Sequence, residues 1–162
     1  MVAMTVVFMA LGAFIEALDL TVAALCSLVM VFVFIEIGSP FTWLVWLGSS
    51  LLGFVFFSGS FVWLTYLLIF GIYPIIKAYI ERLPRLWWII LKLAVFNVMM
   101  LLLMLLFEFI FGVPLFVTDN KLYVIGLYAL CNVAFVVYDI FLTVMIRTYL
   151  NKIRSRFASL LK

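Results

Sequence analysis

The sequence predicts an all-α membrane protein, a bundle of six transmembrane helices with both termini in the cytoplasm and an amphipathic basic C-terminal tail. Hydrophobic residues make up 70% of the chain and charged residues only 10%, whereas soluble domains are about a quarter charged. At about 20 residues per span, 162 residues leave room for six spans but not for a separate soluble domain. We therefore expect a multi-pass protein of the plasma membrane with the lipid bilayer as its first partner.

Breaks between the apolar segments predict the individual helices. We expect spans at 2–17, 21–37, 41–57, 61–80, 85–111 and 122–146, which together form a domain over 1–146, followed by the tail at 147–162. Asp19 is placed to cap the second helix, and Gly38 with Pro40 ends it. Gly71 and Pro74 predict a kink in the fourth helix. The fifth helix, about 42 Å long, exceeds the hydrocarbon thickness and implies tilt.

The first segment is not expected to be a cleaved signal peptide, because no basic residue precedes it and it carries Glu16. Its small residues recur at steps of seven, three and four. These residues, called the alanine stripe below, are Ala3, Ala10, Ala13 and Ala17. Such a stripe allows another helix to approach closely, either from within this chain or from a partner protein.

Two basic clusters predict the orientation. The turn between the fourth and fifth helices holds Lys77, Arg82 and Arg85. The tail holds Arg147, Lys152, Arg154, Arg156 and Lys162. The positive-inside rule places both on the cytoplasmic side, which six spans satisfy. The net charge of +3 is then a membrane-orienting signal, and no nucleic-acid partner is expected.

The tail also has an apolar face. Leu150, Ile153, Phe157 and Leu160 recur at steps of three and four, with most of the basic residues between them. This pattern predicts an amphipathic helix that lies on the inner leaflet or against a partner.

Motifs for catalysis are missing from the sequence. There is no histidine, no GxxxxGK[ST] nucleotide loop and no CxxC pair. Cys26 and Cys131 lie singly within apolar helices and are interpreted as buried thiols. We therefore expect no enzymatic activity, no metal and no cofactor.

Polar groups within the spans are costly in a bilayer, so their positions carry information. Lys92 lies about 10 Å along its helix from Arg85, and Asp139 lies about 12 Å from Arg147 on the next helix. The similar depths predict an ion pair, which either locks the two helices or relays protons or substrate. Asn97 and Asn132 are at comparable depth; with Lys92 and Asp139 they form a predicted polar seam. Lys77 and Glu81, four residues apart, share one helix face.

A second polar group lies toward the predicted outer side. Its acids, amine and aromatic rings suit a small polar or cationic ligand, although rings at this depth also serve as interface anchors. The candidate substrate-binding residues are Glu16, Asp19, Trp63, Tyr66, Glu108, Asp119, Lys121, Tyr123 and Tyr128.

Six short spans, cytoplasmic ends and the stripe residues Ala10, Ala13 and Ala17 resemble the substrate-binding S components of energy-coupling-factor transporters. The resemblance covers the whole chain. It implies binding of a vitamin or similar micronutrient from outside, and docking through the first helix onto a transmembrane coupling protein with two ATPase subunits. The segments 18–25 and 70–77 are also similar to uncharacterised bacterial membrane proteins close to that family.

Two functions follow as expectations. The first is a transport binding subunit that captures a small molecule outside and depends on an ATP-driven partner. The second is a non-transport scaffold, similar to the rod-shape-determining membrane subunit, that recruits partners through helix faces and the basic tail. An outward cavity of ligand size favours the first function.

Overall fold

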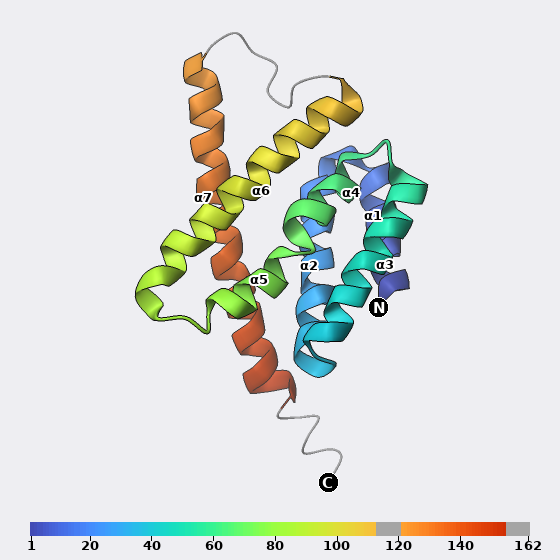
Figure 1. Cartoon of the computed structure of the whole chain (residues 1–162). Coiled ribbons are helices and arrows are strands. Elements are labelled where there is room, and N and C mark those ends of the chain that lie inside the picture. Colours follow the sequence, from blue (N-terminus) through green and yellow to red (C-terminus); the bar gives the residue numbers. More distant parts are fainter. Residues whose placement is uncertain (113–120, 155–162) are drawn as a thin grey trace. The chain divides into compact units, whose positions relative to one another are not determined.

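The computed structural model describes residues 1–112 and 121–154, and these form helices joined by short turns without a β-strand (Figure 1). The side chains of Glu16, Leu86 and Lys121 and of residues 152–154 are not described. The chain divides into two units, Met1–Val117 and Thr118–Lys162. Each unit is described by itself.

The first unit contains most of the helices. Its elements are α1 (Val2–Phe14), the 3₁₀ turn η1 (Glu16–Leu18), α2 (Asp19–Glu36), α3 (Ser39–Phe57), α4 (Phe61–Thr65), the π-helical turn η2 (Tyr66–Phe70), α5 (Tyr73–Ile80), the 3₁₀ turn η3 (Arg85–Trp87) and α6 (Trp88–Phe111). The second unit consists of α7 (Lys121–Thr148) and the π-helical turn η4 (Tyr149–Arg154).

The all-helical class is confirmed for the described residues, and several helices are apolar enough to cross a membrane. Five segments are also long enough: Asp19–Glu36, Ser39–Phe57, Phe61–Ile80, Trp88–Phe111 and Leu122–Asn151. The helix α1 has 13 residues, about 20 Å, which is shorter than the roughly 30 Å of a hydrocarbon core. The count of six spans and the cytoplasmic side of the termini therefore stay predictions.

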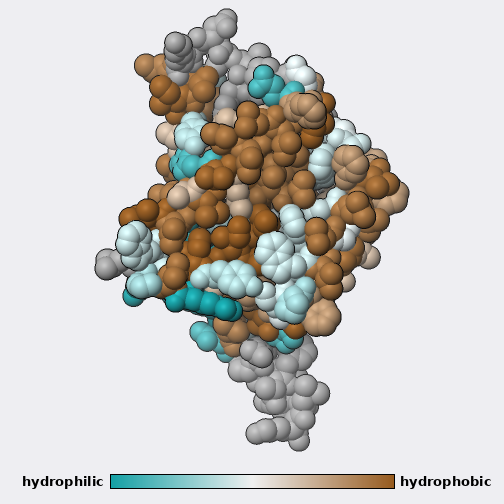
Figure 2. Space-filling view, in the orientation of Figure 1, coloured by the Kyte–Doolittle hydropathy of each residue, from teal (hydrophilic) through white to brown (hydrophobic). Residues whose placement is uncertain are grey.

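Large apolar side chains cover much of the first unit's surface, as the brown area of Figure 2 shows. On α3, Leu51 and Phe56 are 65% and 66% exposed, and on α6 Phe109 is 86% exposed. Exposure of such an apolar surface to water is energetically unfavourable, whereas its contact with lipid tails is not. The exposed faces thus fit a multi-pass membrane protein.

The turns follow the sequence signals, with one exception. Gly38 has a φ of 110°, a conformation that favours glycine, and its carbonyl accepts a hydrogen bond from Thr42 Oγ1 at 2.9 Å. The prediction that Asp19 caps α2 is wrong, because Leu18 occupies the N-cap position and no side chain caps the helix. Because the 3₁₀ turn η1 leads directly into α2, the helix begins at Asp19 itself, one residue earlier than a cap at Asp19 would require. Asp19 therefore lies in the first turn, where the helix dipole favours a carboxylate.

The core of the first unit lies between α1, α2, α4, η2 and α5. Its central residues are Met9, Val22, Ala23, Cys26, Met30, Val62, Tyr66 and Ile75. Cys26 is buried, as expected, and its Sγ donates to the Thr5 carbonyl oxygen at 3.7 Å. Cys131, in the second unit, is half-buried.

The close contact of α1 is made by a glycine beside the alanine stripe. A Cβ on Gly12 would come within 2.8 Å of Val62 Cγ2, so the backbones of α1 and α4 approach at this point. The inward face of α1 consists of Thr5, Met9 and Gly12. In the stripe, Ala10 and Ala13 are half-buried and Ala3 and Ala17 are exposed. Ala17 lies in η1, beyond the end of α1, so the helical stripe is shorter than predicted.

The fourth predicted span is interrupted, as Gly71 and Pro74 indicated. The Gly71 amide donates to the Tyr66 carbonyl oxygen at 2.8 Å, five residues back, which is the π-helical spacing. The helix resumes at Tyr73 with Pro74 in its first turn, where the missing amide is tolerated. The Leu67 carbonyl oxygen instead accepts Trp46 Nε1–H at 3.2 Å. The span is therefore two half-helices, α4 and α5, joined by a packed break.

The predicted amphipathic tail lies largely outside the described residues. The described chain ends within η4 at Arg154, where Leu150 is 39% exposed. Residues 155–162, which include Phe157 and Leu160, are not described. The amphipathic helix of the tail thus stays a prediction.

Candidate functional site

A hollow of about 320 Å³ opens at one end of the first unit. Four helix ends meet there: the end of α1, the start of α2, the turn from α3 to α4 and the end of α6. We call it the aromatic hollow. Its lining residues are Ala13, Asp19, Gly59, Ser60, Phe61, Phe107 and Phe111. This is the end that the basic clusters predict to face outward.

Three phenylalanine rings form one wall of the hollow. Phe61 and Phe107 meet edge to face, with ring centroids 5.5 Å apart and planes at 85°. Phe107 and Phe111 are one helical turn apart on α6, with centroids separated by 4.6 Å. The faces of such rings attract cations through the π-electron quadrupole.

Asp19 supplies a negative charge among the described residues that line the hollow. It is half-buried at the start of α2, so its carboxylate is less screened than one in open water. Ser60 Oγ donates its proton to the Phe57 carbonyl oxygen at 3.0 Å, which directs its lone pairs to other donors. A carboxylate, a hydroxyl acceptor and three rings together suit an organic ammonium group.

Two predicted ligand-binding residues lie in the core instead. Trp63 is 5% exposed, and its Nε1–H donates to the Ser58 carbonyl oxygen at 2.9 Å. Tyr66 is fully buried, with its hydroxyl 2.7 Å from Ser49 Oγ and 3.3 Å from Met30 Sδ. Neither side chain lines the hollow. Trp63 ties α4 to the preceding turn, and Tyr66 ties η2 to α2 and α3.

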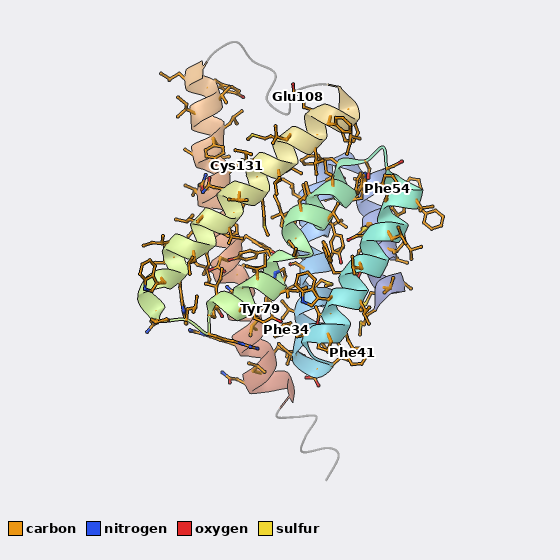
Figure 3. The ribbon with its side chains drawn as sticks, in the orientation of Figure 1. Phe34, Phe41, Phe54, Tyr79, Glu108 and Cys131 are labelled. Atoms are coloured by element: carbon orange, nitrogen blue, oxygen red, sulfur yellow. The ribbon has the colours of Figure 1, made fainter. Side chains whose placement is uncertain are left out.

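The remaining predicted ligand-binding residues are dispersed. Glu108 is exposed near the end of α6 (Figure 3) and does not line the hollow. Glu16 lies in η1. Tyr123, which is exposed, and Tyr128, which is half-buried, belong to α7 of the second unit. Lys121 starts α7, and Asp119 lies outside the described residues. Among the members of the predicted set whose side chains the structure describes, only Asp19 lines the aromatic hollow.

The phenylalanines of the hollow were not predicted, because an apolar residue type gives no sign of a binding site in an apolar chain. The sequence has 18 phenylalanines, and a search for polar chemistry passes over all of them. A usable signal was the pair Phe107 and Phe111, four residues apart just before the helix-ending Gly112. Two rings on one face at a helix end form a ready wall for a ligand.

Lys92, the basic residue of the predicted polar seam, has an ion-pair partner within its own unit. Lys92 Nζ donates to Glu81 Oε1 at 2.7 Å, and Lys77 Nζ lies 3.2 Å from the same oxygen. The sequence spacing placed Lys77 and Glu81 on one helix face, and the structure joins them in an ion pair. We call Lys77, Glu81 and Lys92 the lysine cluster. Asp139 belongs to the second unit, so its pairing with Lys92 stays a prediction.

The two asparagines of the seam bond within their own helices. Asn97 Nδ2 donates to the Leu93 carbonyl oxygen at 2.8 Å, and Asn132 Nδ2 donates to the Tyr128 carbonyl oxygen at 3.0 Å. Both side chains are half-buried. These bonds satisfy one amide proton of each residue at low cost within a membrane. An amide pair between the two helices also stays a prediction.

A double-mutant cycle tests the predicted ion pair directly. We expect Asp139→Asn to destabilise the protein in detergent when Lys92 is present, and to have a much smaller effect in a Lys92→Met background. The coupling free energy should be about 1–3 kcal/mol, measured by thermal or denaturant unfolding. A parallel cycle between Glu81 and Lys92 is the matched control, since that contact is described. Additive effects for Asp139 and Lys92 would reject the pair.

The described residues are all-helical, several of their helices are long and apolar enough to cross a membrane, and a small hollow lies at one end of the first unit. The chain matches no protein-family model, no curated protein and no solved structure. Its function must therefore be argued from its own residues.

Proposed function

We propose that this protein is a membrane-embedded binding subunit that captures a small organic cation from the outer side of the membrane. The observation that carries the proposal is the aromatic hollow, which is lined by Asp19 together with three phenylalanines. Its volume of about 320 Å³ lies at the lower end of the range of ligand pockets, about 300–1,000 Å³. A small vitamin-like or amine solute is the size of ligand that fits.

The position of the hollow supports capture from outside. It lies at the opposite end of α6 from the α5–α6 turn, because Phe107 and Phe111 end the helix that Trp88 begins. The turn carries the basic residues that the positive-inside rule assigns to the cytoplasm. An anionic, ring-lined hollow would then attract cations on the outer surface.

The interrupted fourth span supports movement after capture. Transporters use discontinuous helices near their substrate sites, where half-helices tilt against each other. Here α4 begins at Phe61, which lines the hollow, and α5 ends beside the lysine cluster. A change in the angle between α4 and α5 at η2 would therefore couple the aromatic hollow to the lysine cluster at the other end of the first unit.

Energy for release would come from a partner. The sequence holds no nucleotide-binding loop of the GxxxxGK[ST] type. The resemblance to S components implies a transmembrane coupling protein with two ATPase subunits. The alanine stripe, with Ala3 exposed on α1 and Ala17 exposed on η1, remains the proposed docking surface for that protein.

A non-transport scaffold is the second candidate, and the small size of the hollow favours it. Affinity purification of the full chain from its native membrane, followed by native mass spectrometry, separates the two. A binding subunit should carry coupling-protein and ATPase chains, or a retained small cation that is absent from an Asp19→Asn variant. A Glu36→Gln variant, which removes an acid at the other end of α2, should keep that cation. Recovery of assembly or cell-shape proteins without ligand would support the scaffold instead.

A further inference from the structure

We propose that the turn from α5 to α6 binds the headgroup of an anionic phospholipid. Four basic residues, Lys77, Arg82, Arg85 and Lys92, lie within sixteen positions that contain one acid, Glu81. The proposal is independent of the aromatic hollow, which lies at the other end of α6. It rests on the arrangement of charge, aromatic rings and exposed apolar side chains around this turn.

The buried part of the turn concentrates positive charge. Lys77 is 1% exposed and Lys92 8% exposed, and both ammonium groups contact the same oxygen of Glu81. The indole ring of Trp88 lies under the Lys92 ammonium at 5.7 Å. These contacts tie the end of α5 to the start of α6, and the exposed arginines of the turn lie between them in the sequence.

The exposed part of the turn offers the groups that hold a phosphate. Arg82 and Arg85 are both exposed. The Arg82 guanidinium stacks 5.1 Å from the centroid of the Tyr79 ring. Tyr79 is itself held by Ser39 Oγ, 2.6 Å from its hydroxyl, and by the edge of Phe34 (Figure 3). A stacked guanidinium keeps its N–H edge free of the ring, and that edge matches phosphate oxygens in a bidentate manner.

The surroundings of the turn select a lipid over free phosphate. Trp87 is 57% exposed, and the next helical turn presents Ile89 and Ile90 at 70% and 61% exposure. Figure 2 shows hydrophilic surface at this end of the first unit, directly adjoining a broad apolar surface. A ligand with an anionic head and apolar chains would contact both surfaces. Basic sites beside the cytoplasmic ends of spanning helices bind anionic headgroups by this combination.

Lipid binding to the purified full chain provides the test. Native mass spectrometry with added phosphatidylglycerol or phosphatidylcholine should show adducts that favour phosphatidylglycerol. Arg82→Gln and Arg85→Gln should each weaken phosphatidylglycerol binding about fivefold, the effect of one basic residue near a charged membrane surface. Lys121→Gln, which also removes one positive charge, is the matched control and should change binding less than twofold. The arginines are exposed, so unchanged melting temperatures should accompany the loss.

Three outcomes would overturn the proposal. The first is equal binding of phosphatidylcholine and phosphatidylglycerol. The second is an equal loss in Lys121→Gln and the arginine variants, which would show a general effect of net charge. The third is displacement of phosphatidylglycerol by inorganic phosphate at similar concentration, which would assign the turn to free phosphate. Selective loss in the two arginine variants, with no competition by phosphate, would establish a lipid site.

Discussion

Replacing Gly71 by alanine should lower the stability of the protein by about 2–3 kcal/mol, or roughly 5–10 °C in melting temperature. A Cβ at this position would come within 2.7 Å of Trp46 Cδ1, 2.8 Å of the Tyr66 carbonyl oxygen and 2.9 Å of Tyr66 Cζ. None of these atoms can move aside easily. Tyr66 is held by Ser49 Oγ, and Trp46 is held by the Leu67 carbonyl oxygen.

Thermal unfolding in detergent, followed by circular dichroism or tryptophan fluorescence, measures this effect. Gly126→Ala is the matched control, because a Cβ on Gly126 meets no described atom within 4 Å. That variant should melt at the wild-type temperature or above it, since alanine favours a helix by up to about 1 kcal/mol over glycine. If Gly71→Ala also melts like the wild type, the packed break at η2 is wrong.

Replacing Glu81 by glutamine should also destabilise the protein strongly, by about 2–4 kcal/mol. Two buried ammonium groups share the Glu81 carboxylate, and removal of one partner from a buried ion pair typically costs about 3–5 kcal/mol. The expected loss is set lower because the Glu81 side chain is 28% exposed and water partly screens it. Glutamine keeps the shape but loses the charge, so the effect reports electrostatics.

The same unfolding measurement applies, with Glu108→Gln as the control. Glu108 is exposed, so its change should shift stability by less than about 0.5 kcal/mol. Adding Lys77→Met to Glu81→Gln should recover part of the loss, because it removes the more deeply buried cation. Wild-type stability in the Glu81→Gln protein would show that the lysine cluster contributes little to the fold.

The interruption of the fourth span was predictable because Gly71 and Pro74 act locally. Glycine relaxes the backbone, and proline removes one amide wherever it lies. The π-helical form of the break was not predictable, since it depends on Trp46 and Ser49 from another helix. Similarly, the end of α6 at Gly112 followed from one residue in the left-handed conformation, with a φ of 68°.

The depth of a residue along its helix did not predict the contact between Lys92 and Glu81. Lys92 was paired with Asp139 by counting residues from the basic ends, which treats the helices as straight rods. The contact with Glu81 arises because the tight turn at residues 81–87 returns the chain beside α5. The spacing along the sequence placed Glu81 on one helix face with Lys77 and did not predict its contact with Lys92. A carboxylate can serve two cations, and that possibility is visible only in three dimensions.

The candidate site was the least predictable feature. Asp19 was identified because charge within an apolar chain is rare, and the structure places it in the hollow. Trp63 and Tyr66 were predicted as ligand-binding aromatic rings near the outer side, but both rings are buried and their polar atoms bond within the first unit. The rings that do line the hollow are apolar, so only the meeting of α4 and α6 distinguishes Phe61 and Phe107 from other phenylalanines.

Binding of organic cations by the purified protein tests the proposed function. The probes are tetramethylammonium, choline and benzylammonium, with benzyl alcohol and benzoate as neutral and anionic counterparts of benzylammonium. We expect at least one ammonium ion to raise the melting temperature of the wild type and of Glu36→Gln in a saturable manner, but not that of Asp19→Asn. Benzyl alcohol and benzoate should have no such effect. Equal responses of the wild type and Asp19→Asn, or stabilisation by benzoate alone, would contradict capture of an organic cation at the aromatic hollow.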